Sequence, residues 1–543
     1  MNTVEKYFNQ FPSFFINRGF KDVKSINNFI KPSEEWLNNP FNFDSMDRAV
    51  SEILSNPKKT PIFIHGDCDA DGVSACSVLY HYLKKIGFKV FYHIPNKSNE
   101  GHSISFKTID YAVSIGCKLM ITCDIGMSCF EEIKYAKNNN LRTIVTDHHK
   151  PIDEIPDAIA IINPWTEKNS NLFFKEYSGS AVAFKLCHAI NTELSLDFDY
   201  IYELMGLASI GIVSDKVTMI NENRYISYYG FNMLLKGENP GISLLSKRLF
   251  PYLEGIDIHK IIRVINMTTK LEDSNLAVKL LTTSIPSQIN SYINIIIKKF
   301  KKNQKIFNNI IASSTRQVYS QDYNNNNCIF IVTDFDSAYN GAVANSLSNK
   351  FHIPAIVISK MSNSSNYKGS CRGVNNINNI NLFSFLRSNK DILITLGGHP
   401  MAAGFTINEN NIKHIKESFF NYMKDKKSDI KSDSARVIDG ILELNDINLE
   451  LINFFKKFMP YSTGNSYPIF ISKGISIADK PSIIGKAKES IRLKVEQNGI
   501  TFDSIGIGLI NEFEKLVTEN KLNIEYTIAN NKKNITLNIL GVS

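Results

Sequence analysis

The chain has 543 residues, of which hydrophobic residues make up 43% and charged residues 21%. This length exceeds a single typical core, so we expect two to four packed units. No uninterrupted apolar run reaches the roughly 20 residues that a membrane-spanning helix needs. The amino-terminal segment also lacks the basic start, apolar run and small-residue cleavage site of a secretory signal. These features exclude a membrane span and predict a cytoplasmic protein.

The charge and the cysteines narrow the possibilities further. A formal net charge of +8 suits a polyanionic partner, but spread over this length it identifies none by itself. The 8 cysteines are scattered without a Cys-x-x-Cys pair. This spacing argues against a zinc ribbon or a disulfide framework, and it is typical of reduced, buried thiols.

Short β-branched runs alternate with helical stretches between Pro61 and about Ile162. The expected strands are residues 61–65, 89–94, 118–123, 142–146 and 158–162. Strands that alternate with helices are typical of a parallel sheet covered by helices on both faces. The first large domain is therefore predicted to be α/β.

Apolar residues at helical spacing from Ile289 to Ile310 predict a long amphipathic connecting helix. Its remaining positions carry Lys298, Lys299, Lys301, Lys302 and Lys305. These lysines either form a solvated helix face or follow a phosphate backbone.

The carboxy-terminal half predicts two further folded parts. Strands at 329–333 and 354–359 indicate a second, smaller α/β unit. A charged, Ser-rich segment at 424–435 is typical of a linker. The short alternating strands of 436–543 suit a small β-barrel.

Polar groups gather where the expected strands end. His65, Asp67, Asp69 and Asp71 follow the first strand, and Asp124 follows the third. Asp147, His148 and His149 follow the fourth, and a further candidate, Asp215, follows an apolar stretch. Because the carboxyl ends of parallel strands meet at one edge of a sheet, these groups are expected to converge on one crevice.

Converging carboxylates repel one another unless cations compensate, so the pattern predicts divalent metal. Carboxylate and imidazole ligands without thiolates favour Mn²⁺ or Mg²⁺ over structural zinc. The groups suffice for two ions, which is the apparatus of phosphoester hydrolysis. An EF-hand is excluded because Val78 stands where its loop needs a Glu. Taken singly, His65 also fits a core histidine, and Asp124 or Asp215 a helix cap.

These residues resemble a known family. Asp69-Ala-Asp71-Gly72, Asp124 and Asp147-His148-His149 are similar to the first three motifs of the DHH phosphoesterases. Similarity over nearly the whole chain narrows the resemblance to the RecJ-type exonucleases. Markers in the first half are Arg18-Gly19, residues 32–46, Asn163-Pro164, residues 178–184, residues 208–215 and Asn223-Arg224. Gly341–Ala344, Ser370–Arg372 and Gly397–Gly404 resemble the DHHA1 domain, and Asp439-Gly440, Pro460–Asn465, Pro468 and Phe470 resemble the start of the RecJ OB-fold.

The resemblance implies roles for individual residues. Asp69, Asp71, Asp124, His148 and Asp215 would hold two ions, with Asp67 and His65 as nearby candidates. His149 would donate to the scissile phosphate, and Asp147 belongs to the same catalytic motif.

In the DHHA1 domain, Gly397 and Gly398 would let the backbone approach a phosphate while His399 donates to it, unless the glycines serve tight packing instead. Ser370 and Arg372 would bind the 5′-terminal phosphate.

The chain departs from the family pattern at two DNA-binding elements. Asn266–Lys270 stands where the family has Asn-x-x-Gly-Arg. Pro95-Asn-Lys97 and Glu100-Gly-His-Ser103 stand where it has Pro-Asn-Arg and Glu-Gly-Tyr-Gly. Lys270 and Lys97 keep the charge of arginine but lose its paired donors.

The resemblance implies five parts: a lead-in (1–45), a DHH catalytic domain (46–235), a helical connector (236–312), a DHHA1 domain (313–425) and an OB-fold nucleic-acid-binding domain (436–543). It implies a monomeric 5′ to 3′ exonuclease that acts on single-stranded DNA in repair and recombination and releases 5′-mononucleotides. A single-strand-binding protein and a helicase are candidate partners. The alternatives are an oligoribonuclease or cyclic-dinucleotide phosphodiesterase of the DHH family, and a catalytically inactive DNA-binding scaffold.

Overall fold

The computed structural model describes most of the chain. The described residues are 3–97, 100–151, 154–166, 174–320, 326–361, 364–374, 380–424, 426, 436–484, 490–507, 509, 516, 518, 521–530 and 534–543. They form two compact units, one of residues 1–300, 439–470 and 527–536 and the other of residues 301–438, 471–526 and 537–543. Within the described residues, no helix is both long enough and apolar enough to span a bilayer.

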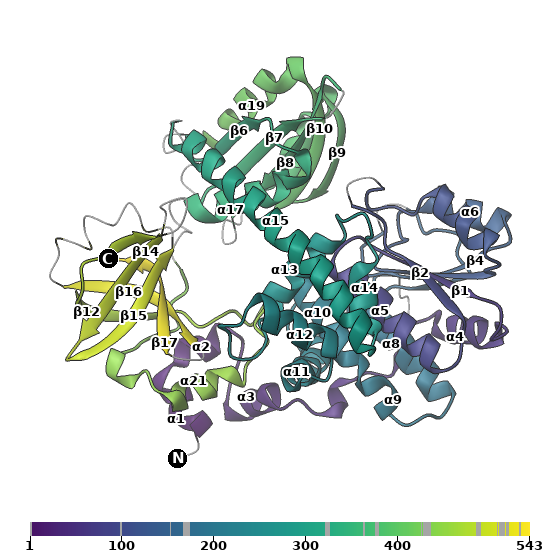
Figure 1. Ribbon diagram of the computed structural model, residues 1–543, viewed down its shortest axis with the longest axis horizontal. Coiled ribbons are helices and arrows are strands. Elements are labelled where there is room, and N and C mark those ends of the chain that lie inside the picture. Colours follow the sequence, from purple (N-terminus) through teal and green to yellow (C-terminus); the bar gives the residue numbers. More distant parts are fainter. Residues whose placement is uncertain are drawn as a thin grey trace. The chain divides into compact units, whose positions relative to one another are not determined.

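The first unit contains a parallel sheet in the order β2-β1-β3-β4-β5, drawn in purple and blue (Figure 1). Its strands are β1 (Ile62–Gly66), β2 (Val90–His93), β3 (Leu119–Cys123), β4 (Arg142–Thr146) and β5 (Ala160–Ile162). The surrounding helices are α4 (Met46–Ser55), α5 (Ala70–Lys85), α6 (Phe106–Ser114), α7 (Phe130–Asn138) and α8 (Gly179–Glu193).

Helices cover both faces of this sheet. One face of the sheet carries Phe63 of β1, Met120 of β3 and Val145 of β4. These side chains pack with apolar residues of α6 and α7. The helices α4, α5 and α8 contact the strands on the opposite face. The predicted doubly covered parallel sheet is confirmed.

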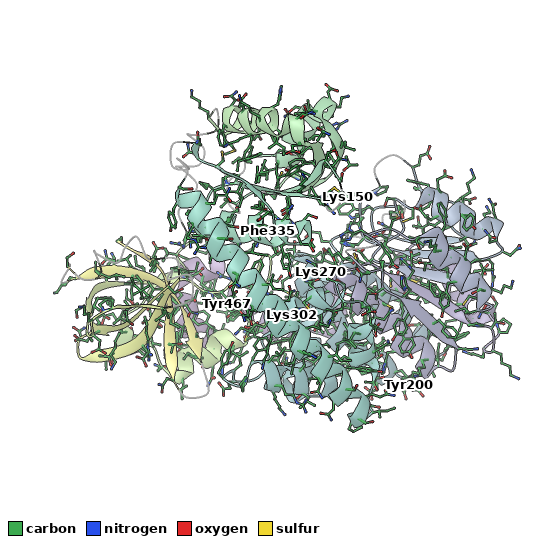
Figure 2. All side chains as sticks on the ribbon, turned by 45° about the horizontal axis from the view of Figure 1, so that its top comes forward. Lys150, Tyr200, Lys270, Lys302, Phe335 and Tyr467 are labelled. Carbon is green, nitrogen blue, oxygen red and sulfur yellow. The ribbon has the colours of Figure 1, made fainter. Side chains whose placement is uncertain are left out.

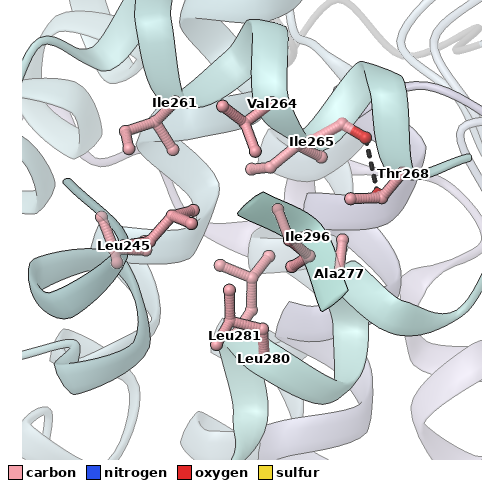
Figure 3. A pocket seen from close by; sticks show the side chains of 10 residues that line it. Leu245, Ile261, Val264, Ile265, Thr268, Ala277, Leu280, Leu281 and Ile296 are labelled. Carbon is pink, nitrogen blue, oxygen red and sulfur yellow. Dashed lines mark hydrogen bonds between the residues drawn. The ribbon is translucent and has the colours of Figure 1, made fainter. Parts of the chain in front are cut away.

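A helical region continues the first unit. Its helices are α9 (Asp199–Tyr202), α10 (Leu204–Asp215), α11 (Asn221–Lys236), α12 (Pro240–Leu249), α13 (Ile258–Thr268), α14 (Leu276–Thr282) and the start of α15 (Pro286–Tyr319). Apolar side chains of α12, α13, α14 and α15 meet around a cavity of about 10 Å³ (Figure 3). A space of this size holds at most one water, so the region is a packed core rather than a ligand site.

The amino-terminal helices α1 (Thr3–Gln10), α2 (Pro12–Ile16) and α3 (Val23–Ile30) pack on α21 (Leu449–Lys456) from the far end of the sequence. Phenylalanine rings of both segments interlock, for example Phe14 with Phe455 at 4.9 Å between centroids. Arg224 is fully buried, and its guanidinium donates to the carbonyls of Phe29, Lys457, Phe458 and Met459. Arg18 forms a buried ion pair with Asp439 at 2.7 Å. The lead-in is thus an integral part of the first unit.

The second unit contains a mixed sheet in the order β6-β7-β8-β10-β9. Its strands are β6 (Ile329–Thr333), β7 (Ala355–Lys360), β8 (Asn366–Arg372), β9 (Leu393–His399) and β10 (Ala402–Asn408). Its helices are α17 (Asn340–Phe351), α18 (Leu382–Ser388) and α19 (Ile412–Lys424). The smaller α/β unit is confirmed. The predicted linker 424–435 lies outside the described residues except for Lys424 and Lys426.

The connecting helix is also present. α15 buries Ile289, Ile293, Ile296, Phe300 and Ile310 along one stripe, as its periodicity predicts. All of its lysines from Lys298 to Lys305 are exposed, and Lys302 is labelled on the helix in Figure 2.

The carboxy-terminal strands form a barrel, drawn in yellow (Figure 1). They are β11 (Gly440–Ile441), β12 (Phe470–Ile477), β13 (Ser482–Ile484), β14 (Ser490–Gln497), β15 (Ile500–Ile507), β16 (Leu522–Asn530) and β17 (Ile535–Val542). Their order is β11-β12-β16-β17-β15-β14-β13, and β14 also pairs with β12, which closes the sheet. The predicted β-barrel is confirmed.

Candidate metal centre and phosphate-binding residues

The register of the parallel sheet sets three aspartates side by side. Gly66 pairs with Cys123, and Cys123 with Thr146, so these three strands end on one line. Asp67, Asp124 and Asp147 follow directly. The amide of Asp67 donates to Cys123 at 3.2 Å and the amide of Asp124 to Thr146 at 2.9 Å. The predicted convergence at the carboxyl edge of the sheet therefore exists.

Asp69 and Asp71 are fixed by helix termini. Asp69 caps α5 by accepting the amides of Asp71 and Gly72 at 2.9 and 3.1 Å. Asp71 accepts the amides of Gly179 and Ser180 at 2.7 and 2.9 Å, at the first turn of α8. A helix amino terminus stabilises a carboxylate, so both side chains are held in one orientation.

Two carboxylate-rich groups of potential ligands result, and Asp124, His148 and His149 form a further group that links them. Asp67, Asp69 and Asp124 bring carboxylate oxygens within 4.8 Å of one another, and Asp71, His148 and Asp215 bring one ligand atom each within the same distance. His148 joins the groups, because its Nε2 lies 3.1 Å from Asp124 and its Nδ1 lies 3.6 Å from Asp215. The arrangement offers two adjoining sites with Asp124 between them.

The carboxylates raise one another's pKa. Burial, together with repulsion from Asp71 and Asp69, raises the pKa of Asp124 well above its usual value. The same causes raise the pKa of Asp215 to about 8. Burial and the charges of Asp67 and Asp71 also raise the pKa of Asp69. Such crowding is costly unless divalent cations occupy the space between the oxygens.

The residues fit divalent metal on a second count. Oδ1 of Asp124 is buried and lies 3.1 Å from His148 Nε2, yet it accepts no hydrogen bond from the described residues. Carboxylate oxygens and one imidazole, without thiolate, form the donor set that Mn²⁺ and Mg²⁺ prefer.

Asp147 orients its neighbours. Its Oδ2 accepts the Met127 amide at 3.0 Å, while its Oδ1 accepts the amides of His148 and His149 and the His149 Nδ1 at 2.7 Å. Burial opposes protonation of His149, but the bond and charge of Asp147 outweigh it and raise the His149 pKa to about 9. His149 is thus a half-exposed cationic donor beside the metal-ligand groups.

His65 stands apart from the other predicted ligands. Its ring is fully buried, lies 5.6 Å from the His93 ring and joins neither ligand group. Burial lowers its pKa to about 3, so the imidazole is neutral. Asp67, by contrast, is in place and accepts His102 Nδ1 at 3.1 Å.

The two lysines of the divergent elements belong to adjoining segments. The amide of Lys97 donates to the carbonyl of Thr269 at 3.0 Å, next to Lys270. Asn266, in the same element as Lys270, accepts the Ala70 amide at 2.9 Å, at the start of α5. Figure 2 labels Lys270 on this segment.

In the second unit, the predicted phosphate-binding residues share one face of the sheet. Across β8, β10 and β9, Ser370 is in register with Gly404 and Gly397, and Arg372 with Ala402 and His399. Opposed residues of antiparallel strands point to the same face. Ala402 and Gly404 have small or no side chains. They therefore leave open space above the sheet between Ser370 and Arg372 on one side and His399 on the other.

The amino terminus of α17 adjoins this face. Arg372 donates to Ser370 Oγ at 3.2 Å and to the Cys371 carbonyl at 2.7 Å. A Cβ at Gly341, in the first turn of α17, would lie 3.0 Å from the Arg372 guanidinium. Gly397 has open space at its Cβ position, whereas Gly398 has φ +131° and its Cβ would press on the Ala402 carbonyl. The open space at Gly397 allows a ligand to approach closely. Gly398, by contrast, allows a backbone conformation that other residues rarely adopt.

Sequence reasoning missed the residues that hold the ligands. The amides of Gly179, Ser180 and Met127 fix Asp71 and Asp147, and a Cβ at Gly179 or Gly211 would overlap Asp124 or Asp71. Backbone donors carry no side-chain signature. The Ser178-Gly-Ser sequence at a helix start is the one local signal that could have identified them.

Metal-free protein is expected to lose stability as the pH rises from about 6.5 to about 8. Asp215 has a pKa of about 8 in the folded chain against 3.8 as its ordinary value. Between these values the folded state holds the extra proton, so stability falls as that proton is lost. His149 acts in the same sense above pH 6.5, because its folded pKa is about 9. The measurement is the midpoint of thermal unfolding at a series of pH values, with chelator and with Mn²⁺.

Mn²⁺ should flatten this dependence, since the cation replaces the protons as counter-charge. Asp215→Asn should reduce it without metal and leave the part that comes from His149. Equal slopes with chelator and with Mn²⁺ would show that the ligand groups do not bind the ion.

Comparison with known families agrees with the geometry. The DHH family, N-terminal domain matches residues 61–212, the DHHA1 domain matches 325–425 and the RecJ OB domain matches 438–539. The first match contains Asp67, Asp69, Asp71, Asp124 and Asp147–His149. The second contains Ser370, Arg372 and Gly397–His399.

The chain is similar to several curated proteins that are named single-stranded-DNA-specific exonuclease RecJ. The chain is 28% identical over 534 residues to the single-stranded-DNA-specific exonuclease RecJ of Bacillus subtilis, covering 96% of this chain and 66% of that protein. It is 24% identical over 520 residues to that of Haemophilus influenzae, covering 91% of this chain and 88% of that one. The Escherichia coli protein is 24% identical over 481 residues, covering 84% and 82%.

Solved structures share the fold. The crystal structure of RecJ in complex with Mn²⁺ from Thermus thermophilus superposes with a TM-score of 0.78 at 20% identity, covering 100% of this chain and 77% of that one. The Mg²⁺ complex of RecJ from the same organism has a TM-score of 0.72 at 19% identity, covering 99% and 76%. With DHH, DHHA1 and RecJ OB domains in this order, the chain belongs to the RecJ type of the DHH/DHHA1 phosphoesterase superfamily.

Proposed function

We propose that this chain is a metal-dependent exonuclease that degrades single-stranded DNA from its 5′ end and releases 5′-mononucleotides. The observation that carries the proposal is the pair of adjoining ligand groups that share the region of Asp124 and His148. The RecJ OB match and the names of the relatives support DNA as the polymer. Two bound Mn²⁺ or Mg²⁺ ions would supply a nucleophile of lowered pKa and neutralise charge on the phosphate.

The chain's own residues would divide the remaining tasks. Asp67, Asp69 and Asp124 would hold one ion, and Asp71, His148 and Asp215 the other, with Asp124 shared. His149 would donate its Nε2 proton to a phosphate oxygen, because Asp147 engages Nδ1 and keeps the ring charged. A charged donor to phosphate makes a hydrogen bond about twice as strong as a neutral one.

The second unit and the barrel would select single-stranded DNA as the substrate. The 5′ phosphate would bind to Ser370, Arg372, Gly397, Gly398 and His399. The phosphate backbone of the DNA would contact Lys97 and Lys270. An OB-fold holds single strands through a basic groove and stacked bases. The proposed setting is DNA repair and recombination in the cytoplasm, as a monomer that works with a single-strand-binding protein and a helicase.

Two other functions compete with this one. A phosphodiesterase for short oligonucleotides or cyclic dinucleotides would use the same ligand groups, but it has no use for a carboxy-terminal barrel. An inactive DNA-binding scaffold would use the barrel, but it has no need of buried, mutually repelling carboxylates.

One assay separates the three. Purified protein with Mn²⁺ is offered a long single strand, the matching duplex and a dinucleotide, and the products are identified. Mononucleotides from the 5′ end of the single strand support the proposal. Cleavage of the dinucleotide alone, or binding without cleavage, would replace it with one of the alternatives.

Arg372→Ala is expected to remove the preference for a 5′-phosphorylated end. Its guanidinium adjoins Ser370 and the start of α17, and burial lowers its pKa, so a phosphate there would meet a partly desolvated charge. Charge-assisted hydrogen bonds contribute about 1.5 to 3 kcal/mol, so apparent affinity should fall roughly tenfold to a hundredfold. The measurement compares 5′-phosphoryl and 5′-hydroxyl oligonucleotides at fixed salt.

Arg387→Ala is the matched control, because Arg387 is an exposed arginine of α18 in the same unit. It should leave the end preference intact. If the preference persists in Arg372→Ala, the anchor lies elsewhere, and Lys270 and Lys97 are tested next.

A further inference from the structure

A cluster of mixed chemistry adjoins the carboxylates. Asp67, Cys68 and His102 each bring one potential ligand atom within 4.8 Å of the others. His102 Nδ1 lies 3.3 Å from Cys68 Sγ, and 3.1 and 3.2 Å from the two oxygens of Asp67. The Cys68 thiol also donates to the Gly101 carbonyl at 3.1 Å. Neither Cys68 nor His102 has a part in the proposed hydrolysis.

The spacing of these atoms approaches the edges of a tetrahedron. With a zinc–sulfur bond of about 2.3 Å and a zinc–nitrogen bond of about 2.0 Å, tetrahedral angles place sulfur and nitrogen about 3.5 Å apart. Nitrogen and a carboxylate oxygen would lie about 3.4 Å apart. The distances from His102 Nδ1 in the structure differ from these by a few tenths of an ångström, so His102 already stands close to the spacing that zinc requires.

The donor set differs from that of the neighbouring groups. Asp67, Asp69 and Asp124 offer oxygen alone, whereas this cluster adds sulfur and imidazole nitrogen. Thiolate selects zinc and similar soft ions over Mn²⁺ and Mg²⁺. His102 also stands where the resembled family has tyrosine.

Charge balance suits a divalent ion. Ionised Asp67 and Cys68 would together neutralise it, with neutral His102 as third ligand and Gly101 or a water as fourth. Burial keeps the free thiol protonated, so binding would release one proton to solvent. The nearby charge of Lys97 repels a cation but favours the anionic forms of both ligands.

We propose that Asp67, Cys68 and His102 form a site for a thiophilic divalent cation such as Zn²⁺, and that its occupation lowers the nuclease activity by engaging Asp67. The regulatory half rests on the proposed function, and the binding half does not. Asp67 belongs both to this cluster and to the neighbouring group of Asp67, Asp69 and Asp124. An oxygen held by zinc turns away from Asp69 and Asp124, so the site acts as an inhibitory zinc sensor.

The binding test uses Co²⁺, which takes tetrahedral zinc sites and absorbs in the near ultraviolet when thiolate binds it. Full-length protein without DNA is titrated with Co²⁺ and then with Zn²⁺. We expect an absorption band that Zn²⁺ abolishes, and that Cys68→Ser removes. His102→Tyr, a change at an exposed side chain that restores the family residue, should weaken Co²⁺ binding about tenfold or more. Cys129→Ser, at another buried cysteine near the same loop, should keep the band.

The activity test compares Zn²⁺ inhibition of Mn²⁺-supported cleavage. Cys68→Ser and His102→Tyr should need about tenfold more Zn²⁺ than wild type for half inhibition. No thiolate band in the wild type, or a band that survives in Cys68→Ser, overturns the site. Equal Zn²⁺ sensitivity in all variants overturns the regulatory half. Failure of the wild type to cleave DNA would sink the proposed function while the Co²⁺ result still decides the site.

Discussion

Asp124→Asn is expected to abolish phosphodiester hydrolysis while the protein still folds and binds DNA. Asp124 lies between the two ligand groups, and its buried Oδ1 lies 3.1 Å from His148 Nε2 but accepts no hydrogen bond from the described residues. Under the proposed assignment both ions would share Asp124 as a ligand, so its loss would affect both. Lost stabilisation of the transition state by several kcal/mol corresponds to at least about a thousandfold in turnover. Turnover on single-stranded DNA with saturating Mn²⁺ measures it.

The same variant should be as stable as wild type, or more stable, when metal is removed. Asparagine cannot ionise, so it relieves the repulsion that raises the Asp124 pKa. Asp199→Asn, at an exposed site on α9, is the control and should change neither quantity. Wild-type turnover by Asp124→Asn would refute the assignment of a shared ligand.

The sheet and its active edge were predictable from the sequence because both depend on local patterns. Buried β-branched runs define strands, and parallel strands end at one edge. Asp67, Asp124 and Asp147 each follow such a run directly, so their convergence followed from the strand ends alone. The α15 stripe was predictable for the same reason, because a period of 3.6 residues is visible in one segment.

Interactions between distant backbone segments were not predictable. The amides that hold Asp71 come from α8, more than a hundred residues away, and the close approach depends on the missing side chains of Gly179 and Gly211. Arg224 likewise binds carbonyls near residues 29 and 458. Any sequence supplies carbonyls and amides, so no residue pattern identifies such partners.

Asp147 and His65 show a further limit. Both lie in the sequence where metal ligands are expected. The oxygens of Asp147, however, accept hydrogen bonds from Met127, His148 and His149. The ring of His65 is buried beside His93. Sequence indicates which side chains reach an edge of the sheet. It does not indicate which direction a side chain takes from the last residue of a strand.

Glu222→Gln is expected to destabilise the first unit by about 3 kcal/mol, because it leaves the charge of Lys185 buried and unpaired. Lys185 on α8 and Glu222 on α11 are both fully buried and lie 2.9 Å apart. Glu222 also accepts hydrogen bonds from the Tyr177 hydroxyl at 2.7 Å and from the Asn38 amide at 3.1 Å. Glutamine can keep these two bonds, so the change isolates the charge. Urea unfolding followed in wild type and variant gives the loss.

The pH dependence of the loss identifies its cause. Burial lowers the pKa of Lys185, and Glu222 partly restores it. Without Glu222 the amine loses its proton more readily, so stability should rise with pH towards the ordinary lysine value of 10.5. A deficit that is constant between pH 7 and pH 10 would point to a packing defect instead. Glu203→Gln breaks the exposed pair with Lys85 and should cost less than about 1 kcal/mol.

Removal of both charges should restore the stability that is lost when only the charge of Glu222 is removed. In Lys185→Met with Glu222→Gln, no unpaired charge is left inside, and apolar replacements of buried ion pairs are often neutral. The pair also supports the metal site, because Tyr177 directly precedes Ser178, Gly179 and Ser180, and the latter two hold Asp71. The double variant should therefore regain both stability and Mn²⁺-dependent turnover. If it regains stability but not turnover, the buried pair positions α8 against Asp71 in a way that an apolar contact does not replace.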